Sequence, residues 1–297
     1  MTMTRKTAIV AAMMLGACWT TACGGGSAQS KAPATADSPG DDDVAAGLLE
    51  HHRHHHHGGV TLFIAMSLDT LGVSPDQRAT VEALRSDLHA RMEQARAAEQ
   101  SLVATLADGL AAGSIDTAKV DLALARLTAA AGALPDASAD ALNRLHDVLT
   151  PPQRNALVDK VQAHWAVWQK ENAAETGASR PEGRLATLQE DLELTTAQVD
   201  RIRAALADET RSVPKLDRAA VATHLRSFSD AFRNERFDAR TLTTASSANV
   251  QLVGWGGGHV ARFVEAVSPV LTQDQRTTLA QELREHASHD PSAQATP

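Results

Sequence analysis

One short phrase of the sequence occurs twice. Residues 149–154 read Leu-Thr-Pro-Pro-Gln-Arg, and residues 271–276 read Leu-Thr-Gln-Asp-Gln-Arg, 122 positions later (271 − 149 = 122). A second pair precedes the first: residues 73–77 read Val-Ser-Pro-Asp-Gln, and residues 194–198 read Leu-Thr-Thr-Ala-Gln, at an offset of 121 (194 − 73 = 121). Two motifs at matched offsets predict that the chain contains an internal duplication.

Each phrase has the form of a helix start. A Ser or Thr hydroxyl at the N-cap accepts a hydrogen bond from the third helical N–H, and a Gln at that third position reaches back to the N–H of the cap. The four pairs are Ser74 with Gln77, Thr150 with Gln153, Thr195 with Gln198, and Thr272 with Gln275. Pro75 and Pro151 then fall at the first helical position, where a missing N–H costs little. The motifs therefore predict four helix starts, and their role is structural.

Composition and hydrophobic spacing favour an all-α fold. The chain is rich in Ala and Leu and has five Phe, four Trp and no Tyr, which favours helices over sheets. Apolar residues recur at helical spacing in both halves. We predict two tandem repeats of long helical hairpins after a disordered tether. The predicted organisation is a signal peptide (1–17), a tether with a His-rich run (18–57), a first repeat (58–172), a linker (173–181), a second repeat (182–289) and a disordered tail (290–297).

Several residues are expected to interrupt or terminate helices. Gly113 should end one helix, and Asp116 should open the next. Pro135 should break or kink that helix, and the three glycines at 256–258 should interrupt a later one. A longer helix is expected to run from about residue 216 to about residue 240.

The N-terminus has the layout of an export signal. Arg5 and Lys6 precede an apolar run at residues 7–17 that is too short to span a bilayer. The run ends in Leu-Gly-Ala-Cys18, which resembles a bacterial lipobox, with Cys23 as the alternative lipid acceptor. A cleaved signal followed by incidental cysteines is the other interpretation. We expect a lipid-anchored periplasmic protein, and Trp19 after Cys18 favours the outer membrane.

Six histidines interrupted only by Arg53 follow the tether. They are His51, His52, His54, His55, His56 and His57. Neutral imidazoles at this density can chelate Zn, Cu or Ni, with Glu50 or the acidic residues 41–43 as oxygen ligands. The alternatives are a polar tether segment with no metal and an expression tag.

The four motifs, in this order and spacing, resemble the Leu-Thr-x-x-Gln family of bacterial envelope proteins, which includes the Spy/CpxP-like chaperones and the zinc-resistance-associated protein. The resemblance covers roughly residues 60–290 as two tandem copies, although residues 73–74 read Val-Ser where the family has Leu-Thr. It implies a helical chaperone that binds unfolded or misfolded envelope proteins without ATP and requires no cofactor. Its other branches imply a metal-binding stress protein or a partner of a sensor kinase. Because the motif is duplicated, the expected state is a monomeric pseudo-dimer or a homodimer.

One predicted helix separates a basic stripe from an apolar stripe. At about 100° per residue, five arginines fall within about 80° of arc: Arg218, Arg226, Arg233, Arg236 and Arg240. Val221, Leu225, Phe228 and Phe232 occupy the adjoining arc. A chaperone could bind clients with this pair of stripes, using the arginines and apolar residues such as Leu225 and Phe232. The alternative is an ordinary amphipathic helix with its apolar side in the core.

Other function classes lack support. The net charge of −8 argues against nucleic acid as a partner. No cysteine follows Cys23, so thiol catalysis in the folded part is excluded, and no catalytic motif is present. We therefore do not expect an enzyme. Trp165 and Trp168 lie three residues apart, which favours a core or a seam between hairpins over a ligand site.

Overall fold

A computed structural model describes residues 64, 68, 71–173, 185, 188–207, 213 and 215–288. All the regular secondary structure in these residues is helical, which confirms the all-α prediction. None of the helices in these ranges is long and apolar enough to cross a membrane. The predicted lipid acceptors Cys18 and Cys23, the tether and the six histidines at 51–57 lie outside the described residues.

The helices follow the duplication. In the first half they are α4 (Pro75–Arg91), α5 (Glu93–Ala112), α6 (Thr117–Val148) and α7 (Pro151–Ala173). In the second half they are α9 (Thr196–Ala207), α10 (Arg218–Arg233), the short 3₁₀ helix η4 (Ala239–Thr241), α11 (Ala245–Val267) and α12 (Gln273–Ser288). At the repeat offset, α5 corresponds to α10, α6 to α11, and α7 to α12.

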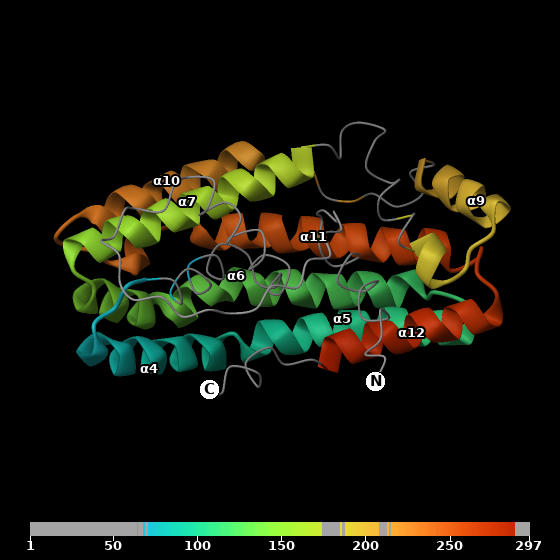
Figure 1. The fold of residues 1–297 in the computed structure, drawn as a ribbon, viewed down its shortest axis with the longest axis horizontal. Coiled ribbons are helices and arrows are strands. Elements are labelled where there is room, and N and C mark those ends of the chain that lie inside the picture. Colours follow the sequence, from blue (N-terminus) through green and yellow to red (C-terminus); the bar gives the residue numbers. More distant parts are fainter. Residues whose placement is uncertain are drawn as a thin grey trace, which may run out of the picture.

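The two halves exchange their closing helices (Figure 1). The corresponding helices α6 and α11 lie side by side along the middle of the molecule. α12 of the second half packs along α5 of the first, and α7 of the first half packs against α10 of the second. The packing is therefore pseudo-symmetric, because each half supplies the same helix to the other.

The hydrophobic core forms two large clusters, one towards each end of the molecule. One cluster combines α5 and the first part of α6 with α9, α12 and the last part of α11. The other combines α4, α7 and the last part of α6 with α10, η4 and the first part of α11. Each cluster buries residues of both halves, so neither half has a core of its own.

Local signals set several helix ends as expected. Gly113 adopts a left-handed conformation with a φ of 77° at the C-terminus of α5, which glycine does without steric cost. The Asp116 side chain accepts a hydrogen bond from the backbone N–H of Lys119 and caps α6. Pro135 does not end α6, which continues to Val148.

The prediction that the glycines at 256–258 interrupt a helix is wrong. α11 runs through them, and Gly257, together with the earlier Gly254, faces α6. A Cβ on Gly257 would come 2.7 Å from Cδ1 of Leu124, and one on Gly254 would come 3.0 Å from Cγ2 of Thr128. The glycines thus allow the two central helices to approach closely, and this packing compensates for their low helix propensity.

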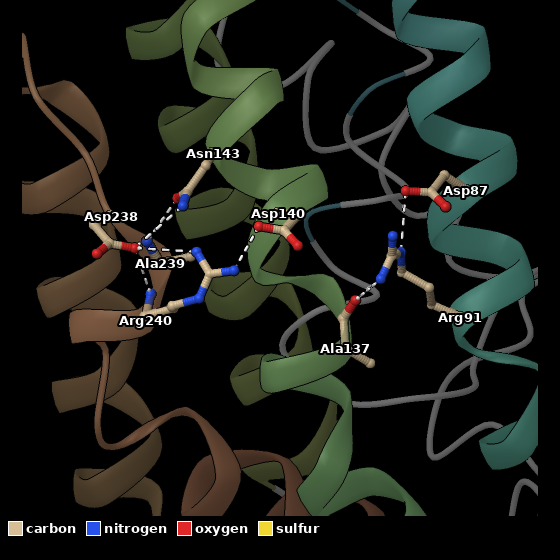
Figure 2. A network of polar contacts seen from close by, with 8 residues as sticks. All are labelled: Asp87, Arg91, Ala137, Asp140, Asn143, Asp238, Ala239 and Arg240. Carbon is tan, nitrogen blue, oxygen red and sulfur yellow. Dashed lines mark hydrogen bonds and ion pairs between the residues drawn. The ribbon is translucent and has the colours of Figure 1, made fainter.

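The prediction that one helix runs to about residue 240 is also wrong. α10 ends at Arg233, and Asn234 is extended, with a φ of −69° and a ψ of 165°. A polar network then attaches the returning chain to α6 (Figure 2). Asn143 Oδ1 accepts from the N–H of Ala239 at 2.7 Å, and Asn143 Nδ2 donates to Asp238 at 3.1 Å. These tertiary contacts replace the helical hydrogen bonds that the local sequence would otherwise favour.

Candidate functional site

Reciprocal side-chain and backbone hydrogen bonds define the starts of α4, α9 and α12. At α4, Ser74 Oγ accepts from the N–H of Gln77 at 3.3 Å, and Gln77 Oε1 accepts from the N–H of Ser74 at 3.0 Å. The Thr195–Gln198 and Thr272–Gln275 pairs repeat both bonds. At α7, Gln153 Oε1 accepts from both the N–H and the hydroxyl of Thr150, each at 3.0 Å.

The glutamines of the first half also bind each other. Gln77 Nε2 donates to Gln153 Oε1 at 2.9 Å, and Gln153 Nε2 donates to Gln77 Oε1 at 2.8 Å. The second N–H of each amide donates to a backbone carbonyl, that of Val148 for Gln77 and that of Gly72 for Gln153. Both N–H donors of each side chain are therefore used, and the starts of α4 and α7 are joined.

The second half has a similar arrangement, with one direct bond between its glutamines. Gln198 Nε2 donates to Gln275 Oε1 at 2.8 Å and to the carbonyl of Val270 at 3.1 Å. Gln275 Nε2 donates to the carbonyl of Leu192 at 2.9 Å. Sequence reasoning missed these pairings. A signal was available, because a capping glutamine uses its carbonyl oxygen and leaves two N–H donors that a part-buried site must satisfy.

The five arginines predicted as one stripe are divided between a helix and the turn after it. Arg218, Arg226 and Arg233 lie on α10, whereas Arg236 and Arg240 lie beyond its end. Arg233 forms an ion pair with Asp159 of α7 at 2.6 Å, and Arg240 pairs with Asp140 of α6 at 2.5 Å. Arg226 is exposed and donates to the hydroxyl of Thr223 at 3.0 Å. The stripe on α10 is therefore shorter than the sequence predicted. Arg233 and Arg240 form ion pairs with neighbouring helices.

The apolar partners of the stripe are buried. Leu225 is 2% exposed and Phe232 is 0% exposed, and both belong to the core that α10 shares with α7 and α6. Phe232 packs edge-on against His146. The ring centroid of Phe232 lies 4.9 Å from that of Phe237. In the described conformation, α10 presents arginines without the exposed apolar neighbours that the sequence predicted. This conformation fits the alternative interpretation, in which α10 is an ordinary amphipathic helix with its apolar side in the core.

An aromatic cluster lies where α7, α10 and α11 meet. Trp165 and Trp168 stack with their ring centroids 5.0 Å apart, and Trp255 of α11 meets Trp168 edge-on at 5.2 Å. The guanidinium of Arg218 lies 5.7 Å from the centre of the Trp168 ring, within range of a cation–π contact. Trp165 is buried, but Trp168, Trp255 and Arg218 are only half-buried. This cluster is the part-exposed aromatic surface beside the arginines of α10.

The histidines of the folded part do not form a metal site. Within the described residues, no three His, Cys, Asp or Glu side chains lie together in a way that could hold a metal ion. His146 bonds to the Asn234 carbonyl and lies 2.7 Å from the guanidinium of Arg154, while His224 bonds to Thr244. His164 is buried and contacts the carbonyl of Lys160.

Comparison with known proteins gives one match. Residues 44–156 are similar to a heavy-metal resistance family. The match spans 113 residues (156 − 44 + 1 = 113) of 297, close to the repeat offset of 121–122. It includes the His-rich run at 51–57 and both capping motifs of the first half. No curated protein and no solved structure matches the chain significantly.

Proposed function

We propose that this chain is an envelope protein of the heavy-metal stress response that binds unfolded or aggregation-prone exported proteins without ATP. The observation that carries the proposal is the similarity of residues 44–156 to a heavy-metal resistance family, on a helical body built around the paired capping motifs. The two repeats in one chain would replace the two subunits of a homodimer. The N-terminal lipid on Cys18, or on Cys23, would hold this body at the periplasmic face of the outer membrane.

The surface that we assign to clients is the aromatic cluster together with the arginines of α10. Half-buried Trp168 and Trp255 offer apolar area, and Arg218 and Arg226 supply positive charge for approaching chains. Leu225 and Phe232 are core residues in the described conformation, so there they pack within the protein and do not contact a client.

A charge-reversal pair tests this assignment. Arg226→Glu changes an exposed cation of α10 that forms no ion pair with the described residues, and Arg284→Glu changes a cation of α12 that pairs with Asp108 of α5. In aggregation assays with a denatured client, the first substitution is expected to weaken suppression several-fold, and the second to leave it unchanged. Equal effects of the two substitutions would remove α10 from the client surface.

The same similarity favours a second candidate, a metal-binding stress protein that buffers or senses Zn, Cu or Ni through its histidines. The matched segment begins at residue 44 and therefore includes His51, His52, His54, His55, His56 and His57. Replacing these six residues by Gln in the whole chain separates the candidates. If metal binding is the function, the variant loses its zinc and copper affinity. If chaperone activity alone is the function, the variant still suppresses client aggregation.

A further inference from the structure

The buried face of α10 carries one ionisable side chain. His224 is 3% exposed and lies among Val221, Leu225 and Phe228 on the face that α10 turns to the core. Its Nδ1 lies 2.9 Å from the hydroxyl of Thr244, the N-cap residue of α11. His224 therefore sits between α10 and the start of α11, at a point where the positive end of the α11 dipole disfavours an added proton.

Among the described residues, no acidic side chain lines the space beside His224. Beside His224 is a cavity of about 10 Å³, room for about one water molecule, and apolar residues line the rest of it. They are Ile64, Pro135, Leu142, Phe228, Ala239, Leu242 and Ala245. Burial lowers the pKa of His224 from 6.5 to about 4. The folded state thus holds His224 neutral at pH values where a histidine in water begins to ionise.

The charged groups on the neighbouring elements point elsewhere. On α6, Asp140 is exposed and pairs with Arg240 of η4, and Asp136 is also exposed. Asp238 is held by Asn143 and by the backbone N–H of Arg240. On α10, Arg226 and Asp230 are exposed, and α11 carries no Asp, Glu, Lys or Arg before Arg262. Within the described residues, burial is the cause of the lowered pKa of His224, and no carboxylate lines the space beside it.

We infer that His224 is an acid-sensitive latch: its protonation releases α10 from α6, α7 and α11 and exposes the apolar residues Leu225, Phe228 and Phe232 beside the arginines of the same helix. A protonated imidazole must reach water, and it can do so only when the buried face of α10 opens. The open helix would present the apolar and basic stripes together. This inference rests on the proposed function for its use, because it names the condition under which the client surface enlarges.

The sign of the effect follows from the pKa. Above pH 6.5 the neutral histidine contributes fully to the closed state, and this contribution is lost as the pH falls from 6.5 towards 4. At pH 5, the ratio of the open to the closed population rises about 30-fold because of His224, given an ordinary pKa in the open state.

Hydrogen exchange of the whole chain at pH 7.5 and pH 5.0 tests the latch. After correction for intrinsic exchange rates, peptides of α10 are expected to gain about 30-fold in opening at pH 5.0. His224→Gln, which cannot ionise, should abolish this gain, and peptides of α12 should show no such change in either protein. His224→Leu provides a second non-ionising variant should the Gln variant be poorly folded. An equal gain in wild type and in a folded variant would overturn the inference.

A client assay at the two pH values separates this inference from the proposed function. With both correct, the wild-type chain suppresses aggregation better at pH 5.0 than at pH 7.5, and His224→Gln loses the difference. If α10 opens in acid but no client is held at either pH, the latch stands and the chaperone proposal fails. If clients are held equally at both pH values by wild type and variant, the proposed function stands and the latch has no role in it.

Discussion

The side-chain amides of Gln77 and Gln153 donate to each other, at 2.8 and 2.9 Å, although 76 residues separate them. Each glutamine also caps its own helix, so one side chain closes a helix end and joins it to another. Gln198 and Gln275 form the corresponding junction of the second half. The motif therefore encodes both the start of a helix and its partner.

Removing one glutamine should destabilise the fold by more than a lost cap alone. Gln153→Ala leaves the Gly72 carbonyl, the Thr150 N–H and the Gln77 amide without their partner, so we expect a loss of about 1–3 kcal/mol in the free energy of unfolding. Urea denaturation measures it. Gln281→Ala, at an exposed position of α12 where the side chain bonds only to Glu285, is the control and should change stability by under about 0.5 kcal/mol. Similar losses in both variants would contradict the pairing.

Two adjacent glycines of α11 should respond differently to alanine. A Cβ on Gly256 meets nothing within 4 Å, so Gly256→Ala should stabilise α11 by about 0.5–1 kcal/mol through helix propensity. A Cβ on Gly257 would meet Leu124 of α6 at 2.7 Å, and the side chain of Leu124 would have to move. We expect Gly257→Ala to be less stable than Gly256→Ala by about 1–2 kcal/mol. Thermal unfolding of the two variants under identical conditions checks this, and equal stabilisation would show that the helices do not cross at Gly257.

The polar network of Figure 2 contains a part-buried hydrogen bond, from Ala239 to Asn143, and an exposed ion pair, between Arg240 and Asp140. Asn143→Ala leaves the N–H of Ala239 without its partner and removes one of the hydrogen bonds that Asp238 accepts, which should cost about 1–2 kcal/mol. Arg240→Ala removes an ion pair to Asp140 between side chains that are 55% and 62% exposed, which should cost under about 0.5 kcal/mol. Chemical denaturation ranks the two variants. A larger loss for Arg240→Ala would mean that charge, rather than the Asn143 bonds, holds the turn on α6.

The parts of the fold that depend on neighbouring residues could be predicted from the sequence, and those that depend on distant ones could not. A cap at Ser74 or Thr272 acts within three residues, so the motif locates the helix start. α10 stops at Arg233 because of contacts with Asn143, about 90 positions earlier. Gly257 lies within α11 and faces Leu124 on another helix, a contact that no local pattern records. The exchange of α7 and α12 between the halves likewise depends on packing that no local pattern records.

In the candidate client surface, too, the features set by neighbouring residues could be predicted, and those set by distant residues could not. Helical periodicity correctly grouped Leu225 and Phe232 on one face of α10, but it could not show whether that face is covered. The structure buries it against α6, α7 and α11. Trp168 and Trp255 come from different halves of the chain, so their contact depends on the pseudo-symmetric packing of those halves.

Our proposal is that this chain binds unfolded proteins without ATP. It is tested most directly by light scattering of a chemically denatured client diluted into buffer, with and without the purified whole chain, and with no nucleotide present. We expect suppression of scattering near one chain per client, and equal suppression by the variant in which the six histidines at 51–57 are Gln. No suppression at any ratio would contradict the proposal, and zinc and copper titration of the unmodified chain would then test the metal-binding candidate.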